Sequence, residues 1–201
     1  TDQINHPQML NSLPANIMKV PSPWQADPRY REFCGTAWYK RSIDLIAGSL
    51  SGEQVIILCF GAVDYYAEVW VNDIKVGEHE GGYLPFELDI TSSIKEGSNV
   101  VSVKVEAPPE IFAEIPHGKQ SWYGMLSGLW QSVWVESRAA VYIQHVRITS
   151  QGEEVAAEVE LSSATSPELT LCCEVFAPDG DICATLRSSS LHPTLHIPAP
   201  Q

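Results

Sequence analysis

The chain has 201 residues, of which 44% are hydrophobic, so it can bury one or two apolar cores and does not resemble a disordered chain. Its net charge of −13 argues against nucleic acid as a partner, because phosphates are bound mainly by Lys and Arg. No apolar run reaches the roughly 20 residues of a membrane-spanning helix, so no membrane partner is predicted.

Strand-like segments dominate the chain. Short stretches that alternate apolar and polar residues are separated by turn residues, and no segment of a dozen residues repeats with the period of a helix. This pattern predicts an all-β protein of the sandwich type. In chain order, the predicted strands are 38–45, 55–60, 65–71, 84–88, 99–105, 132–136, 141–149, 154–161, 168–176, 182–186 and 191–197.

The best-defined local feature is a hairpin that begins at Tyr66–Val71, where apolar and polar residues alternate. The pair Asn72-Asp73 follows, and both residue types tolerate the left-handed backbone of a tight turn. A second strand restarts at Ile74 and is expected to end at Gly77. The next residues, His79–Tyr83, are then expected to form an exposed polar and aromatic loop.

A domain boundary is predicted near residue 138. All six Trp residues lie before it, and after it the chain becomes a plain alternation of Val, Ile, Leu and Glu with Ser-rich loops. The first part therefore carries the large aromatic side chains, whereas the second has the composition of a packing unit. We expect two domains, at residues 1–138 and 139–201.

The five cysteines show no CxxC motif and no Cys/His spacing typical of zinc, so we expect no metal and no cofactor. We interpret the cysteines as buried free thiols, which favour a reducing compartment such as the cytoplasm. The first residues, Thr1–Asn5, do not form a signal peptide, and removal of one ahead of Thr1 stays open.

Three segments, taken together and in this order, resemble the N-terminal sugar-binding domain of glycoside hydrolase family 2. They are Gly35–Arg41 (GTAWYKR), Gly61–Phe86 (GAVDYYAEVWVNDIKVGEHEGGYLPF) and Ile115–Trp134 (IPHGKQSWYGMLSGLWQSVW). The family comprises β-galactosidases, β-glucuronidases and β-mannosidases. The resemblance spans roughly residues 20 to 137, and three ordered blocks are far more specific than one hairpin.

The resemblance implies a fold and a partner for the chain. In this family a jelly-roll sandwich is followed by an immunoglobulin-like sandwich and then by a (β/α)₈ barrel that hydrolyses the glycoside. Residues 139–201 correspond to an incomplete immunoglobulin-like domain, and the barrel is absent. We therefore interpret the chain as a fragment whose missing partner is the C-terminal barrel and whose parent enzyme acts on a β-glycoside.

No catalytic residue is predicted in this chain. Retaining glycosidases need two carboxylates about 5–5.5 Å apart, and the family carries both on its barrel. The acidic residues here lie at turns or alternate along a strand, which is typical of solvated carboxylates. They are Asp64, Asp73, Glu78, Glu80 and Asp89.

The main binding candidate is the segment 117–124. A sugar site needs hydrogen-bonding groups for the hydroxyls and a flat ring for the C–H face. The candidate residues are His117, Lys119, Gln120, Ser121, Trp122 and Tyr123. In the resembled family the matching loop helps to shape the innermost sugar subsite, and the alternative is that its aromatic rings pack the domain against the barrel.

A second candidate loop contains His79, Glu80 and Tyr83, where paired glycines allow close backbone approach and Tyr83 could stack on a sugar. The alternative is a structural crossover. Of the other aromatic residues, Trp38 is expected in the core, and Trp24 is a candidate for lining a cleft.

Three functions therefore remain open from the sequence. The chain is the non-catalytic part of a family 2 β-glycosidase, or a free-standing carbohydrate-binding module, or a β-sandwich that only contacts other proteins. The first agrees best with the three ordered blocks. The sugar that the parent enzyme cleaves is not specified, because specificity depends largely on the barrel.

Overall fold

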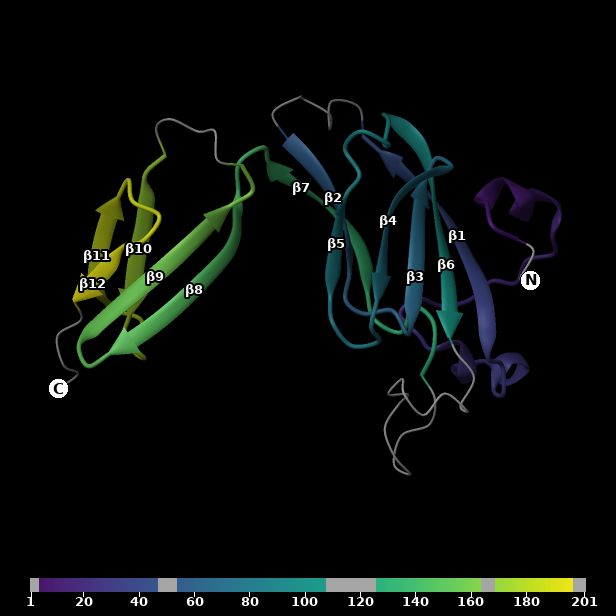
Figure 1. The fold of residues 1–201 in the computed structure, drawn as a ribbon, viewed down its shortest axis with the longest axis horizontal. Coiled ribbons are helices and arrows are strands. Elements are labelled where there is room, and N and C mark those ends of the chain that lie inside the picture. Colours follow the sequence, from purple (N-terminus) through teal and green to yellow (C-terminus); the bar gives the residue numbers. More distant parts are fainter. Residues whose placement is uncertain (1–3, 47–53, 108–125, 164–168, 197–201) are drawn as a thin grey trace. The chain divides into compact units, whose positions relative to one another are not determined.

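A computed structural model of the chain describes residues 4–46, 54–107, 126–163 and 169–196. The chain divides into two compact units, Thr1–Ser137 and Arg138–Gln201. The regular structure in the described residues consists of β-strands and three short 3₁₀ turns, so the all-β prediction is confirmed (Figure 1). No helix in the described ranges has the length and apolar character needed to cross a membrane.

The first unit is a sandwich of two antiparallel sheets (Figure 1). One sheet has the order β1-β6-β3-β4, and the other has the order β5-β2-β7. The strands are β1 (Gly35–Leu45), β2 (Gln54–Phe60), β3 (Tyr66–Val71), β4 (Ile74–Glu80), β5 (Phe86–Asp89), β6 (Gly97–Ala107) and β7 (Val133–Ala139). The 3₁₀ turns are η1 (Pro7–Ser12), η2 (Trp24–Ala26) and η3 (Pro28–Tyr30).

The core of this sandwich follows from the period of two in its strands. Alternate residues of β2, β3 and β6 point between the sheets, and their side chains are almost fully buried. The cluster includes Leu58, Phe60, Val69, Val71, Val103 and Val105. Trp24 joins it at 2% exposure, and its indole N–H donates to the carbonyl of Phe33 at 3.0 Å. The interpretation of Trp24 as a cleft residue is therefore wrong.

The turn between β3 and β4 has the predicted left-handed backbone, with φ of 50° at Asn72 and 68° at Asp73. Asn72 also ties the turn to the start of β6. Its Nδ2 donates to the buried Oδ1 of Asn99 at 2.8 Å, and its Oδ1 accepts from the backbone N–H of Val100 at 3.0 Å. The register of this hairpin is thus fixed by side-chain hydrogen bonds as well as by backbone conformation.

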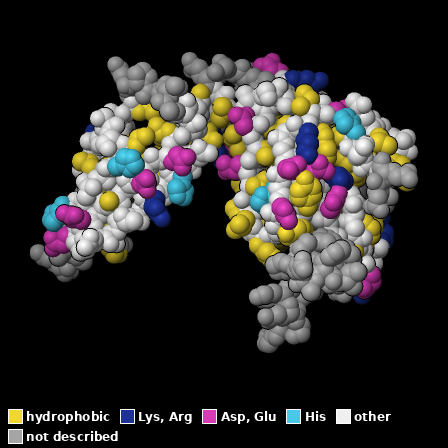
Figure 2. Space-filling view, viewed as in Figure 1, with side chains coloured by type: hydrophobic (Ala, Val, Ile, Leu, Met, Phe, Trp, Pro, Cys, Tyr) yellow, Lys and Arg dark blue, Asp and Glu magenta, His cyan; other side chains and the backbone are white. Residues whose placement is uncertain are grey.

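The opposite face of the first sheet carries a Trp pair and a row of charges. Trp38 and Trp70 pack with ring centroids 4.9 Å apart, outside the central core, so the assignment of Trp38 to that core is wrong. Lys75 and Lys104 both bind Glu68, at 2.5 and 3.1 Å. Figure 2 shows basic and acidic side chains among hydrophobic ones on the face of the first unit turned to the viewer.

The second unit is smaller and has two sheets, β12-β9-β8 and β10-β11. Its strands are β8 (Ile143–Gln151), β9 (Glu154–Leu161), β10 (Leu171–Phe176), β11 (Ile182–Ser188) and β12 (Thr194–His196). Two hydrophobic side chains are buried among its described residues, Val159 and Leu195, whereas Ile148 is 69% exposed and Phe176 is 58% exposed. We retain the assignment of this unit as an incomplete immunoglobulin-like domain as a prediction.

Several local predictions need correction. The second strand of the hairpin does not end at Gly77 but continues to Glu80: the pairing with β3 shifts register between Trp70 and Val69 and resumes where Gly77 pairs with Val69. Leu84 lies outside β5 and is 69% exposed. The five cysteines form no disulfide, as expected, but Cys59 alone among them is buried, and Cys172 and Cys183 are exposed. These two lie on strands whose outward face meets solvent.

Candidate functional site

The main predicted binding segment lies outside the described residues. This applies to His117, Lys119, Gln120, Ser121, Trp122 and Tyr123, all of which fall within 108–125. The described residues on either side of that gap are close together at one end of the first sandwich. The backbone N–H of Tyr65 donates to the carbonyl of Glu106, and Asp64 pairs with Gly128 in an isolated β-bridge. The binding role of this segment stays a prediction.

The second predicted site is only in part a loop. His79 and Glu80 belong to β4, so their side chains point to opposite faces of the sheet. The His79 ring stacks on Phe86 at 4.1 Å, and Phe86 stacks in turn on Phe60 at 4.6 Å. Burial lowers the pKa of His79 below its ordinary value, and its Nε2 has no hydrogen-bond partner among the described residues. His79 is therefore a packing residue rather than an exposed ligand group.

The remaining residues of this segment lie closer to solvent. Glu80 is exposed and accepts a hydrogen bond from the Tyr65 hydroxyl at 2.9 Å. Tyr83 is 53% exposed and meets Trp130 edge to face, with ring centroids 5.9 Å apart. The structure thus joins Tyr83 to Trp130 instead of to His79. An exposed Tyr on a Trp is the kind of aromatic platform that sugar C–H faces bind.

Asp64 is the residue that sequence reasoning misjudged. The sequence predicts a solvated turn carboxylate, yet Asp64 is 4% exposed and its Oδ1 has no hydrogen-bond partner in the described part of the chain. Burial raises the pKa of Asp64 to about 6. A buried carboxyl with a raised pKa at one end of a sandwich is typical of functional sites. Its position directly after the apolar run Val55–Val63 does not reveal its burial, because the groups that cover it, at Gly82 and Gly128, come from other parts of the chain.

Gly82 makes the position of Asp64 possible. A Cβ on Gly82 would lie 2.7 Å from Oδ1 of Asp64, so a side chain at this position has no room. The carbonyl of Gly82 accepts a hydrogen bond from the indole N–H of Trp130 at 2.8 Å. The backbone of Gly81 donates to the carbonyl of Tyr65 at 3.0 Å. The paired glycines therefore bring Asp64, Tyr83 and Trp130 into one cluster, which we call the Asp64 cluster.

A second set of contacts holds the segment 126–130. The side chain of Gln25 binds both the backbone N–H and the hydroxyl of Ser127, at 2.9 and 3.0 Å. The Tyr39 hydroxyl lies against Gly128, where a Cβ would collide with it, and burial raises the pKa of Tyr39 to about 12. Ser127, Gly128 and Leu129 are all buried. This side of the Asp64 cluster is consequently built on rigid, well-packed backbone.

One further group of side chains has the geometry for a cation. Atoms of Cys59, Glu87 and Glu136 lie within 4.8 Å of one another on neighbouring strands of the second sheet. The carboxylates already have other partners, because Glu136 accepts from the indole of Trp134 and Glu87 from the thiol of Cys59. We assign no metal to this group.

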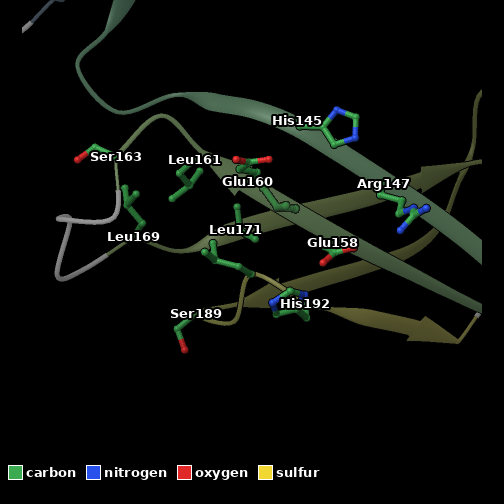
Figure 3. Close-up of a pocket in the computed structure, with 12 residues that line it drawn as sticks. His145, Arg147, Glu158, Glu160, Leu161, Ser163, Leu169, Leu171, Ser189 and His192 are labelled. Carbon is green, nitrogen blue, oxygen red and sulfur yellow. The ribbon is translucent and has the colours of Figure 1, made fainter.

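The second unit contains a cavity of about 760 Å³. It is lined partly by Leu161, Leu169 and Leu171, and partly by polar groups that include Arg147 and His192. In Figure 3 the three leucines lie close together, while His145 and Arg147 project from a neighbouring strand. None of the predicted site residues lines this cavity, so it does not coincide with the Asp64 cluster.

Comparison with known proteins places the chain in a family. The model described as "Glycosyl hydrolases family 2, sugar binding domain" matches residues 14–137. A β-glucuronidase of Paenibacillus borealis is 28% identical in an alignment that covers 92% of this chain and 34% of that protein. A β-glucuronidase of Canis lupus familiaris is 41% identical over 90 residues, which cover 43% of this chain and 14% of that protein.

Solved structures show the same fold. A Ruminococcus gnavus β-glucuronidase in complex with D-glucuronic acid has a TM-score of 0.72 at 25% identity, covering 95% of this chain and 36% of that one. A Faecalibacterium prausnitzii β-glucuronidase has a TM-score of 0.73 at 21% identity, covering 93% of this chain and 36% of that one. The chain thus spans about a third or less of the proteins that it matches. Because the family model covers more than half of its residues, the chain belongs to glycoside hydrolase family 2 and contains the family's sugar-binding domain.

Proposed function

We propose that this chain is the non-catalytic part of a family 2 β-glycosidase and that it supports the sugar-binding cleft of a catalytic barrel. The observation that carries this proposal is the Asp64 cluster, in which the exposed ring of Tyr83 packs on the half-buried ring of Trp130 beside a buried carboxyl. Described residues on both sides of the predicted binding segment approach this cluster: Gly128 exchanges backbone hydrogen bonds with Asp64, and Glu106 accepts one from Tyr65. Aromatic rings and hydrogen-bonding groups at one end of a sandwich fit an edge of a sugar subsite.

The substrate class of the parent enzyme follows from the family. Named relatives are β-glucuronidases and a β-galactosidase, so the proposed substrate is a β-glycoside. The two carboxylates of a retaining glycosidase would be supplied by the barrel. In this division of labour the present chain contributes contacts to the sugar and leaves bond cleavage to the partner domain.

Kinetics in a longer protein that contains this chain and its barrel would test the cleft role. Tyr83→Ala and Trp122→Ala should each raise KM or lower kcat for a nitrophenyl β-glycoside, because each removes a ring from the proposed subsite. Trp134→Ala is the matched control, since Trp134 is also exposed but lies on β7, away from the Asp64 cluster. Unchanged kinetics in both Tyr83→Ala and Trp122→Ala would contradict the proposal.

A free-standing carbohydrate-binding module is the second candidate, and the exposed ring of Tyr83, which packs on Trp130, favours it. Titration of the chain with β-glucuronides and β-galactosides, followed by Trp fluorescence, separates the two functions. A free-standing module should bind with a Kd of about 1 mM or tighter. A cleft that the barrel must complete should show no saturation in that range.

A further inference from the structure

Asp64 is an ionisable residue in a buried environment that disfavours its charged form. It is 4% exposed, its Oδ1 has no hydrogen-bond partner, and it takes part in no ion pair within the described ranges. A carboxylate taken out of water without a cation or donor is strongly disfavoured relative to its neutral acid. The structure is therefore better matched to the protonated form.

Three segments of the chain meet at Asp64. The backbone of Asp64 exchanges two hydrogen bonds with the backbone of Gly128, at 3.1 and 2.8 Å. Its Oδ1 lies against Gly82, and Gly82 is bound to Trp130 through the indole N–H. A change in the charge or position of this carboxyl consequently reaches both Gly81–Tyr83 and Gly128–Trp130.

The ionisable groups around Asp64 do little to stabilise the negative charge of its carboxylate. Tyr65 follows it, and its pKa is raised chiefly by its hydrogen bond to Glu80 and in part by Asp64. The segments packed against it contribute Glu80 and His79 from β4 and Glu106 from β6, and the segment 126–130 has no titratable residue. No Lys or Arg is among these groups, so within the described residues ionised Asp64 meets acidic and aromatic neighbours.

We propose that Asp64 is a proton-dependent latch: the neutral acid allows Gly81–Tyr83 and Gly128–Trp130 to pack together, and ionisation of Asp64 loosens that packing. The latch does not depend on sugar binding, so it stands apart from the function proposed above. Its effect is to make the conformation of the Asp64 cluster respond to pH in the mildly acidic range.

The direction of the effect follows from linkage. A carboxyl whose pKa is higher in the folded than in the unfolded chain stabilises the fold when protonated. The contribution is complete below about pH 4, and it is lost as pH rises through about 6, the pKa of Asp64 in the folded chain. His79 acts in the opposite sense, because its pKa is lowered by burial. The two contributions must therefore be separated with single variants.

The most direct readout is the indole N–H of Trp130, observed by ¹H–¹⁵N NMR of the 201-residue chain from pH 4.5 to 8. The chain has six Trp residues, and Trp130→Phe identifies the signal. We expect the signal to shift with a midpoint near pH 6 in the unmodified chain and not in Asp64→Asn. Asp44→Asn is the matched control, since Asp44 is exposed on β1 and should leave the titration intact.

Carbon-13 NMR of the Asp64 carboxyl in the unmodified chain gives a test that needs no folded variant. We expect a midpoint well above the ordinary range of exposed Asp carboxyls. In Asp64→Asn, the ratio of the unfolding equilibrium constants at pH 7.5 and pH 4.5 should be smaller by tenfold or more than in the unmodified chain. A carboxyl midpoint below pH 4.5, or an indole titration that persists in Asp64→Asn, would overturn the latch.

Discussion

The carboxyl of Asp64 and the backbone of Gly82 are in such close contact that a methyl group on Gly82 would lie 2.7 Å from Oδ1 and 3.1 Å from Cγ. The two residues are far apart in the sequence and belong to different connections of the sandwich. Their contact explains why the pair of glycines follows β4. It also makes residue 82 the sharpest probe of the Asp64 cluster.

Gly82→Ala should destabilise the chain by about 1–3 kcal/mol, because the new Cβ must displace a buried carboxyl. The free energy of unfolding from urea titrations measures the effect. In an Asp64→Ala background the same substitution should cost clearly less, since the clash is then removed. Equal costs in the two backgrounds would show that Asp64 and Gly82 are not coupled.

His79→Phe should protect the chain against acid. Neutral His79 stacks on Phe86, and its lowered pKa means that stability is present near neutral pH and lost as pH falls below about 6.5. Phe keeps the stacked ring and cannot be protonated. Melting temperatures between pH 7 and pH 4.5 should therefore fall less in His79→Phe than in the unmodified chain. His192→Phe, an exposed site in the second unit, should behave like the unmodified chain.

Trp24→Ala should cost about 3–5 kcal/mol of the first unit's stability, because a fully buried ring and its hydrogen bond to Phe33 are lost. Trp134→Ala is the control, since Trp134 is 44% exposed. Chemical denaturation followed by far-UV circular dichroism measures both. Similar midpoints for the two variants would place Trp24 outside the core.

Trp122→Ala distinguishes a cleft role from a packing role for the predicted binding segment. If Trp122 contacts sugar, its removal should leave the melting temperature of the chain nearly unchanged. If Trp122 is a core residue, its loss should cost roughly 3–5 kcal/mol and lower the melting temperature by many degrees. A large drop would exclude the cleft role.

The sequence was most informative where structure is decided locally. The left-handed turn at Asn72-Asp73 follows from the chemistry of two adjacent residues, and the strands of the first sandwich follow from their alternation. Gly77 was misleading because the pattern predicts that it ends a strand. Glycine stands there because Leu88 occupies the space that a Cβ at position 77 would need. That contact comes from another strand and leaves no trace in the local pattern.

The burial of Asp64 and Trp24 could not be predicted for the same reason. Asp64 is covered by Gly82 and Gly128, and Trp24 is held by Phe33 and the carbonyl of Ser127. Each of these contacts is tertiary, so a polar residue after an apolar run and a Trp between Pro and Gln both resemble surface residues. Of the second predicted loop, Tyr83 is the residue that lies in the Asp64 cluster, and its binding role stays a prediction.

The central claim is that this chain supports sugar binding without performing hydrolysis. The most direct measurement is the turnover of nitrophenyl β-glucuronide and nitrophenyl β-galactoside by the purified 201-residue chain. We predict rates equal to the buffer blank, because a retaining glycosidase needs two carboxylates, one as acid and one as nucleophile, and the family carries both on its barrel. Turnover above the blank that disappears in Glu80→Gln would contradict the claim and assign catalysis to this chain.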